Sequence, residues 1–398
     1  MFCGGESPGL TGEVLARSYG HLTNFSLLSR YVYFKLAELP FLPSLLSRLY
    51  QSGRPISSLL TPLFSRTVYS VFCGGASFTD ALPLIHSLQE MNIMVMVDYA
   101  VEHSPSPDKI RRVHHRWKEF VKEAASSNIH FIALKVSGLI PPSVLEEVSR
   151  LVASGKKPSI HPWREYEESV SALVNYGVSL GIRWLIDAEE SWIQPAIDYL
   201  ALQWMRAHNR KEPLIYTTIQ CYLTDAPRKV RELLSRAHGE GWLPAIKLVR
   251  GAYVQKERER ARLLNYPSPL LPSKRAVDTQ YNTLLKELIR FTPARLCVAT
   301  HNLASTCLAL TLTEKEHAGN RVWFSHLLGM ADPLTHYLAL RNQLVAKFIP
   351  IGPVSETIPY LLRRLEENSG IHQQFSREKG WILMEMRRRT SLPSRISP

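Results

Sequence analysis

The sequence Ala-Ile-Lys-Leu-Val-Arg-Gly-Ala-Tyr at residues 245–253 places a lysine inside a short aliphatic run and ends that run in polar residues. Such a run is too short for a buried helix, and its continuous apolar character is typical of a strand that is covered on both faces. Helical patterns precede it at 229–238 and follow it at 276–291. We therefore predict a strand between two helices, the unit from which parallel sheets are built.

The same unit recurs along the chain. Strands are predicted at 93–97, 131–136, 184–186, 214–219, 245–249, 296–299, 322–324 and 345–351. Helices are predicted at 109–125, 144–152, 166–180, 193–208, 229–238, 276–291, 304–317, 333–344 and 355–368. Eight strand-helix units predict a (βα)8 barrel of the α/β class. An open doubly wound sheet is the alternative, but neither GxGxxG nor GxxxxGK[ST] occurs.

The regions outside these units are simpler to describe. Residues 10–70 carry helical periodicity broken by prolines. We predict an N-terminal helical arm over residues 1–70, which could include a targeting segment. A helix is predicted at 77–91 with Ser77 as its N-cap. We predict the barrel over 71–385 and a basic tail over 386–398. The 398 residues suffice for one barrel and an arm, since a barrel uses about 250.

Composition narrows the possible partners and compartments. The formal net charge of +13 favours anionic surfaces, which leaves nucleic acid, anionic lipid and acidic substrates open. The five cysteines form no CxxC pair, which favours a reducing compartment. No apolar run of 18 residues occurs, so no membrane-spanning helix is predicted.

Polar residues follow the predicted strands, where the active site of a (βα)8 barrel lies. They are Asp98, Glu102, Lys135, Asp187, Glu189, Glu190, Gln220, Lys247, Arg250, Tyr253, His301, Asn302 and His326. Lys135 and Lys247 lie within apolar runs, where an unpaired ammonium would be costly to bury. Each lysine could form a structural ion pair with Asp187 or Glu189. Their clustering at successive strand ends favours an active site instead.

Two common classes of site lack support. No HxH, no HExxH and no spaced set of His, Asp and Glu occurs, so no metal site is predicted. No GxSxG occurs, and the surroundings of the cysteines carry no signature of a nucleophile. Hydrolysis by a catalytic triad is therefore not predicted.

The helix predicted at 355–368 has two distinct faces. Ile358, Leu361, Leu362 and Leu365 form an apolar stripe, and the opposite face carries Glu356, Tyr360, Arg363, Arg364 and Glu367. The helix could lie on the outside of the barrel with its charged face in water. It could also cross the barrel mouth, where two guanidinium groups would bind a carboxylate. Periodicity does not distinguish these orientations.

These residues together resemble the flavin-dependent proline dehydrogenases, including the closely similar hydroxyproline dehydrogenases. The most specific motifs are KLVRGAY at 247–253 and YLLRRLEEN at 360–368. Shorter similar segments include MVMVDY at 94–99, LIDAE at 185–189, QCYL at 220–223, ATHN at 299–302 and HLLGM at 326–330. They occur in family order over roughly residues 70–385.

The resemblance implies a distorted (βα)8 barrel that binds FAD noncovalently, with the final helix over the mouth. The residues implied at the flavin are Asp187, Gln220, Lys247, Val249, Gly251, Ala252, Thr300, His301 and Asn302. The residues implied at the substrate are Lys135, Tyr253, Leu327, Phe348, Tyr360, Arg363, Arg364 and Glu367. Lys135, Lys247, Arg363 and Arg364 are the implied catalytic residues, with both arginines on the substrate carboxylate.

The implied reaction is oxidation of L-proline to Δ1-pyrroline-5-carboxylate, the first step of proline catabolism, by hydride transfer to flavin N5. Family likeness further implies a mitochondrial enzyme on the matrix side of the inner membrane. It would associate peripherally with that membrane and pass electrons to a quinone. The basic segment at 387–389 is compatible with an anionic leaflet. No residue stands out as the base that deprotonates the amine.

Residue Phe348 bears on the substrate. The proline enzymes carry Tyr at this position and the hydroxyproline enzymes a small residue, so the bulk of Phe348 favours L-proline. The alternatives are trans-4-hydroxy-L-proline, another cyclic or secondary amine, or an inactive barrel that binds RNA or another polyanion. The basic residues are dispersed and no RNA-binding motif occurs, so no nucleic-acid partner is predicted.

Overall fold

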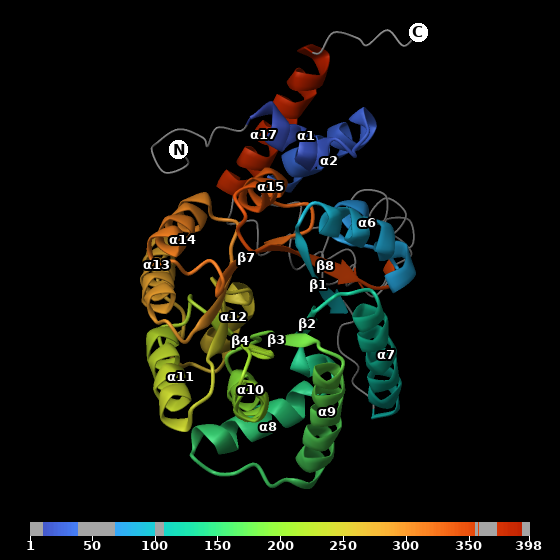
Figure 1. The fold of residues 1–398 in the computed structure, drawn as a ribbon. Helices are drawn as coiled ribbons and strands as arrows, with labels where there is room; N and C mark the ends of the chain where they lie inside the picture. Colours follow the sequence, from blue (N-terminus) through green and yellow to red (C-terminus); the bar gives the residue numbers. More distant parts are fainter. Residues whose placement is uncertain (1–10, 39–67, 100–106, 355–356, 358–371, 392–398) are drawn as a thin grey trace.

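The computed structural model describes residues 11–38, 68–99, 107–354, 357 and 372–391. Eight parallel strands close into a barrel in sequence order (Figure 1). They are β1 Met94–Tyr99, β2 Phe131–Leu134, β3 Arg183–Ile186, β4 Ile215–Gln220, β5 Ala245–Val249, β6 Arg295–Ala299, β7 Val322–Leu327 and β8 Val345–Ile351. Because β8 pairs with β1, the predicted barrel is confirmed and the open sheet is wrong.

Helices surround the barrel on its outside. They are α6 Phe78–Glu90, α7 Pro107–Ser126, α8 Pro142–Ala153, α9 His161–Ser179, α10 Gln194–His208, α11 Ala226–Glu240, α13 Lys274–Arg290, α14 Leu303–Lys315 and α15 Asp332–Leu340. The predicted N-cap of α6 is confirmed, because Ser77 and Asp80 form a reciprocal capping box. The helix predicted at 355–368, and with it the helix over the mouth, lies outside the described residues.

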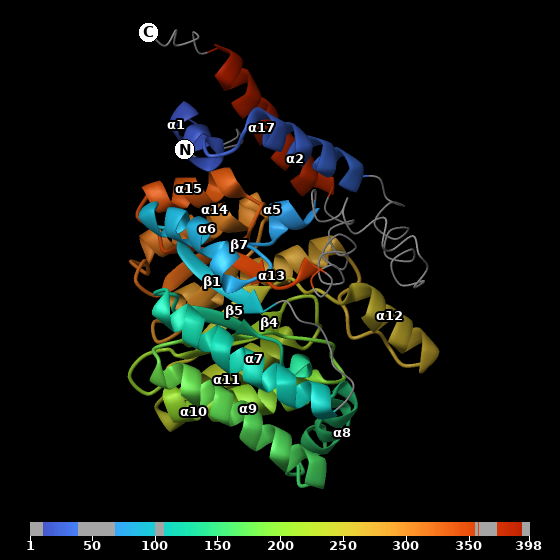
Figure 2. The ribbon, with the colours of Figure 1, turned by 90° about the vertical axis from the view of Figure 1, so that its right-hand side faces the viewer.

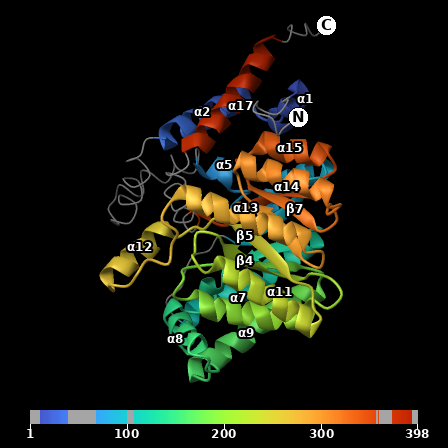
Figure 3. The ribbon, with the colours of Figure 1, turned by 90° about the vertical axis from the view of Figure 1, so that its left-hand side faces the viewer.

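Helix α12 and helix α17, His372–Ser391, were not predicted from the sequence. Helix α12, Val254–Leu263, projects from the barrel between β5 and α13 (Figures 2 and 3). Its sequence is mostly charged and has no apolar stripe, so periodicity did not reveal it. Polar contacts hold it instead: Glu257 accepts hydrogen bonds from Ser191, and Arg260 bonds Glu146.

The two faces of the strands carry different residues. Outward residues such as Val97, Ile246 and Leu248 belong to the large core shared with the helices. Inward residues form a second, separate cluster: Met96, Phe131, Ala133, Leu185, Tyr216, Ala245, Cys297, Trp323, Ala346 and Phe348. The barrel interior is therefore packed with side chains, as in other (βα)8 barrels, and forms a floor beneath the strand ends.

A small helical layer lies beside α15 (Figure 1). It consists of α1 Gly12–Tyr19, α2 Asn24–Ala37 and α17 His372–Ser391. Helices α2 and α17 run antiparallel, because Lys379 pairs with Glu38 at one end and Arg389 bonds Asn24 at the other. Helix α17 continues past residue 386, where the tail was predicted to begin, because Glu385 pairs with both Arg388 and Arg389.

No helix within the described ranges is long and apolar enough to cross a bilayer. The short helix α5, Ser70–Phe72, leads from the arm into α6. The short helices α1 and α2 agree with the helical character predicted for the arm, and residues 39–67 lie outside the described residues.

Close packing against β3 generates a prediction for Gly177 in α9. A Cβ at this position would lie 2.5 Å from the ring of Trp184, which is completely buried. Replacing Gly177 by Ala should lower the free energy of unfolding by about 1–3 kcal/mol, despite the better helix propensity of Ala. Urea denaturation measures the change.

Gly380 in the middle of α17 is the matched control, since nothing lies within 4 Å of its Cβ position. Its replacement by Ala should be neutral or stabilise by up to about 1 kcal/mol. Equal effects of the two substitutions would contradict the packing argument.

Candidate active site

Four charged side chains meet at the carboxyl ends of β1, β2, β3 and β5. Lys135 Nζ lies 2.8 Å from Asp98 Oδ2 and 3.8 Å from Asp187 Oδ2. Lys247 Nζ lies 2.7 Å from Asp187 Oδ1. Asp187 therefore joins the two lysines, and the ion pairs that the sequence analysis considered are present. We call Asp98, Lys135, Asp187 and Lys247 the charge quartet.

Burial makes these pairs obligatory. Asp98 is 1% exposed, and Asp187 and Lys247 are each 7% exposed. An isolated charge at such depth would be costly, whereas two lysines beside two carboxylates leave the quartet neutral. The quartet thus holds two ammonium groups in place at the barrel mouth.

Phe348 forms an apolar wall next to the quartet. It points inward from β8, and Lys247 Nζ lies 5.0 Å from the centre of its ring. An ammonium at this distance is attracted by the face of the ring. The position that bears on substrate choice is therefore in contact with the lysine implied at the flavin.

The end of β4 and the loop after β5 are joined through Gln220. Its Nε2 donates to the carbonyl oxygen of Glu189 at 2.8 Å, and its Oε1 accepts from the backbone N–H of Ala252 at 3.2 Å. Gly251, between Val249 and Ala252, has φ 132°, and a Cβ there would overlap the ring of Tyr222. The loop that follows the KLV strand therefore requires glycine at this position.

The segment Thr300-His301-Asn302 follows β6. His301 Nε2 accepts a hydrogen bond from the backbone N–H of Leu327 at 3.0 Å, which joins the ends of β6 and β7. Asn302 Oδ1 accepts from Ser305 N at 3.0 Å and caps α14, so this side chain already has a structural task. Thr300 accepts a hydrogen bond from Arg250.

Arg250 itself is held from several sides. Its Nε donates to Asp278 Oδ1 at 2.7 Å and its Nη2 to Ser305 Oγ at 2.8 Å, and its guanidinium lies 4.4 Å from the centre of the Tyr281 ring. The sequence placed Arg250 at a strand end, and the structure shows it as a link between that end, α13 and α14. Tyr253, implied at the substrate, is buried just before α12, with Lys256 Nζ 5.5 Å from its ring centre.

Glu189 is a buried carboxyl group that the resemblance does not assign. Its Oε1 accepts from the backbone N–H of Ser137 at 3.0 Å, and its Oε2 accepts from the Ser137 hydroxyl. Burial raises the pKa of Glu189 to about 7, although both hydrogen bonds from Ser137 oppose the shift. Its position two residues after Asp187 was the sequence signal, while nothing local marked Ser137.

The donor set at these strand ends fits a flavin. Two-electron reduction places negative charge on the flavin ring, and the buried ammonium of Lys247 is a fixed group that complements such charge. The residues of the described part that the resemblance assigns to the flavin all lie at the ends of β3 to β6. Within the described residues, no group of three or more His, Cys, Asp or Glu side chains is arranged to hold a metal ion.

The remaining implied residues cannot be placed. Tyr360, Arg363, Arg364 and Glu367 lie outside the described residues, as does Glu102, which follows β1. The orientation of the helix that carries them therefore stays a prediction.

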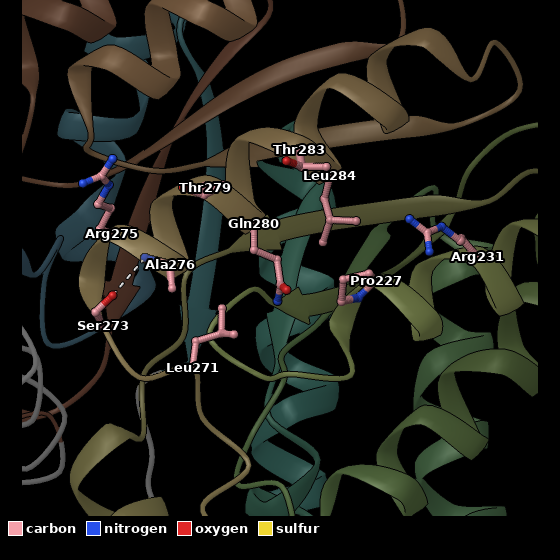
Figure 4. Close-up of a pocket in the computed structure, with 10 residues that line it drawn as sticks. All are labelled: Pro227, Arg231, Leu271, Ser273, Arg275, Ala276, Thr279, Gln280, Thr283 and Leu284. Atoms are coloured by element: carbon pink, nitrogen blue, oxygen red, sulfur yellow. Dashed lines mark hydrogen bonds between the residues drawn. The ribbon is translucent and has the colours of Figure 1, made fainter.

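A separate hollow of about 550 Å³ lies on the flank of the barrel between α11 and α13 (Figure 4). Its lining includes Arg231 and Gln280, and none of the predicted site residues. The Gln280 amide donates to the carbonyl oxygens of Cys221 and Leu223 at 2.9 and 2.7 Å. This hollow is distinct from the strand ends.

Comparison with known proteins identifies similar chains. The family model described as proline dehydrogenase matches residues 81–377. Human "Proline dehydrogenase 1, mitochondrial" is 38% identical over 229 residues, which are 56% of this chain and 38% of that protein. The "Carbapenem antibiotics biosynthesis protein CarD" of Pectobacterium carotovorum subsp. carotovorum is 30% identical over 329 residues, 82% of this chain and 85% of that protein.

Solved structures show the same fold. The proline utilization A protein of Bdellovibrio bacteriovorus, inactivated by N-propargylglycine, aligns with a TM-score of 0.70 at 18% identity. The alignment covers 90% of this chain and 40% of that one. The chain thus spans about two fifths of the human relative and of this structural neighbour.

The raised pKa of Glu189 predicts a pH-dependent stability. Between pH 4.5, the ordinary pKa of a glutamate, and about pH 7, Glu189 is ionised in the unfolded chain and protonated in the folded one. The unfolded state then binds fewer protons, so the stability contributed by this group falls as pH rises through that window. Replacing Glu189 by Gln should remove this pH-dependent loss of unfolding free energy, which amounts to about 3 kcal/mol because each pKa unit corresponds to about 1.4 kcal/mol.

Urea denaturation at pH 5, 6, 7 and 8 tests this effect. The free energy of unfolding of Glu189→Gln should rise relative to that of the unsubstituted protein between pH 5 and pH 7. Above pH 7 the difference between the two proteins should stay constant. The exposed Glu168→Gln change in α9 is the control and should show no such trend, because its partner Arg164 stays charged over this range. Parallel curves for Glu189→Gln over the whole range would show that the carboxyl is ionised in the folded state.

Proposed function

The chain belongs to the proline dehydrogenase family, and we propose that it oxidises L-proline to Δ1-pyrroline-5-carboxylate with FAD as the hydride acceptor. The observation that carries the proposal is the buried Lys247–Asp187 ion pair at 2.7 Å. It places the lysine of the KLVRGAY motif at the barrel mouth, where (βα)8 enzymes act.

We propose that nine residues contact the flavin: Asp187, Gln220, Lys247, Val249, Gly251, Ala252, Thr300, His301 and Asn302. Bound FAD would supply a two-electron acceptor. Lys247 would stabilise the charge that develops during transfer, and Asp187 would keep the ammonium in position. Because both are buried, their electrostatic effect is stronger than it would be in water.

The substrate pocket would lie over the same strand ends. We propose Lys135, Tyr253, Leu327 and Phe348 as its described members, with Tyr360, Arg363, Arg364 and Glu367 from the helix at 355–368. Two guanidinium groups match a carboxylate bidentately, so Arg363 and Arg364 would orient the ring of the amino acid for transfer from C5. Lys135, held by Asp98, would contribute a second fixed cation.

Phe348 supports L-proline as the substrate. The ring is 7% exposed and faces Lys247, so it would crowd a hydroxyl group at C4. A hydroxyl group without a partner in such surroundings also loses hydrogen bonds to water. Trans-4-hydroxy-L-proline is the second candidate, followed by other cyclic or secondary amines. An inactive polyanion-binding barrel is the alternative of a different class.

We further propose a mitochondrial enzyme that passes electrons to a quinone while bound peripherally to the matrix side of the inner membrane. The curated relatives from human and Drosophila melanogaster are named mitochondrial.

Support for membrane binding comes from an exposed apolar stripe on α2 at helical spacing: Phe25, Leu28, Val32 and Leu36. Phe25 is 79% exposed. Residues 12–38 and 372–391 carry eight Arg or Lys against four Glu, which favours an anionic surface.

The visible spectrum of the purified, FAD-loaded protein tests the reaction. Flavin absorbance should bleach on anaerobic addition of L-proline, and more slowly with trans-4-hydroxy-L-proline. Replacing Phe348 by Ser should raise the hydroxyproline rate relative to the proline rate by about tenfold, because it opens the wall beside Lys247. A protein that takes up no FAD would contradict the proposal. Preferential bleaching by trans-4-hydroxy-L-proline would make that compound the substrate in place of L-proline.

Cosedimentation with vesicles tests membrane binding. Vesicles that contain about 30% anionic lipid should carry the protein down at low salt, with release at high salt. The double change Phe25→Ser and Leu28→Ser should weaken binding at least about tenfold, since two exposed side chains would no longer bury apolar surface in lipid. Leu180→Ser, which alters an exposed leucine after α9, is the control. Equal sedimentation of all three proteins would exclude the α2 stripe as the contact.

A further inference from the structure

The turn between β7 and α15, residues 328–331, carries strain next to the active site. Gly329 and Ala331 have φ values of 76° and 53°, in the left-handed region. Ala331 pays a steric cost there that glycine would not pay. Surrounding contacts must therefore hold the turn in this conformation.

Lys347 supplies the first of these contacts. It lies on the outward face of β8 and is 1% exposed. Its Nζ lies 2.6 Å from Asp332 Oδ1 and donates to the carbonyl oxygens of Met330 at 2.6 Å and Leu327 at 3.4 Å. All three ammonium protons thus have acceptors, and all three acceptors are in or directly beside the turn.

Arg30 in the N-terminal arm completes this contact. Its Nη1 donates to Asp332 Oδ2 at 3.1 Å, and both side chains are 12% exposed. Burial alone would raise the pKa of Asp332, but Lys347 and Arg30 outweigh it and hold that pKa below the ordinary value. Each oxygen of the Asp332 carboxylate is therefore matched to its own cation.

Helix α17 fastens the other side of the turn. Glu378 Oε1 accepts from the backbone N–H of Ala331 at 3.1 Å and from Arg377 Nη2 at 2.9 Å. The Nη1 of the same arginine donates to the carbonyl oxygen of His301 at 2.8 Å. The arm and α17 thus meet the barrel at the turn that follows β7.

The residue directly before the turn, Leu327, belongs to the candidate substrate pocket. Leu327 donates its backbone N–H to His301 Nε2 at 3.0 Å, and Leu328 donates its backbone N–H to the carbonyl oxygen of Phe348 at 2.9 Å. A displacement of the turn would therefore move Leu327 relative to both His301 and Phe348.

We propose that Arg30 is a positioning residue, which acts through Asp332 and Lys347 on the turn at 328–331 and so sets how well Leu327 fits the substrate. The inference rests on the proposed function for the identity of the substrate. It assigns the N-terminal arm a task that its sequence does not reveal, namely support of the pocket from behind β8.

Charge balance indicates that the fold tolerates loss of Arg30. The buried cluster contains the cations Arg30, Lys347 and Arg377 and the carboxylates Asp332 and Glu378. Without Arg30 it retains two cations and two carboxylates, so no buried charge is left without a counterpart. What is lost is the charged hydrogen bond to Asp332 Oδ2, and with it one restraint on the turn.

Hydrogen exchange of the full-length, FAD-loaded protein tests the proposal without relying on turnover. Replacing Arg30 by Gln should speed exchange of the amides of Leu327, Leu328 and Ala331 by about tenfold, the size expected for a lost charged hydrogen bond. Arg17→Gln, which alters an exposed pair with Glu13 in the same arm, should leave these amides unchanged. Arg30→Lys, which keeps the charge, should recover part of the protection.

Kinetics separate positioning from general stability. The KM for L-proline should rise about three- to tenfold in Arg30→Gln with kcat within about twofold, because substrate and transition state lose the same contact. Arg30→Met, which also removes the hydrogen bond to Asp332 Oδ2 but keeps the length of the side chain, should reproduce the local exchange effect and serves if Arg30→Gln does not fold.

Two results would overturn the inference: unchanged exchange at residues 327–331, or faster exchange spread evenly over the barrel. If the unsubstituted protein does not oxidise proline while the local exchange effect is present, the proposed function is wrong. The proposal that Arg30 holds the turn at 328–331 in place would then still stand.

Discussion

The need to neutralise buried ammonium groups is the constraint on which this structure depends. Lys135 and Lys247 lie at strand ends where water cannot solvate them fully, so carboxylates must lie within ion-pair distance. Asp98 and Asp187 meet this need only if β1, β2, β3 and β5 end at the same level. Closure of the barrel brings these strand ends together, because the inward-pointing residues of neighbouring parallel strands form common layers.

The same constraint recurs on the outside of β8. Phe348 points into the barrel beside Lys247, while its neighbour Lys347 points outward to Asp332 and the turn after β7. One strand thus contributes both a wall of the candidate pocket and the buried charge that fastens the arm. Strand β8 thus lies between the charge quartet, which Phe348 faces, and the charges around Asp332, which Lys347 joins to the helical layer of α1, α2 and α17.

Local patterns predicted elements well where packing on both faces leaves a continuous apolar run. The bounds of β5 and β8 agree with the predicted runs. The run predicted for β7 ended at residue 324, three residues before the strand ends at Leu327, because Ser325 and His326 interrupt the apolar pattern. Helix α12 was missed because ion pairs and Ser191, rather than an apolar stripe, hold it. Residues Asp187, Gln220, Lys247 and His301 were predicted at strand ends, and the structure places them there.

The sequence by itself determined the barrel, the strand ends and the family, because apolar periodicity and the KLVRGAY motif are local properties of the chain. Only the tertiary structure decided which charges pair. Arg30 and Asp332 are separated by 302 positions, and Ser137 and Glu189 by 52, so neither contact has a local signal. Such partners are selected by burial, since each charged or polar group removed from water must find whichever complement the closed barrel brings within reach.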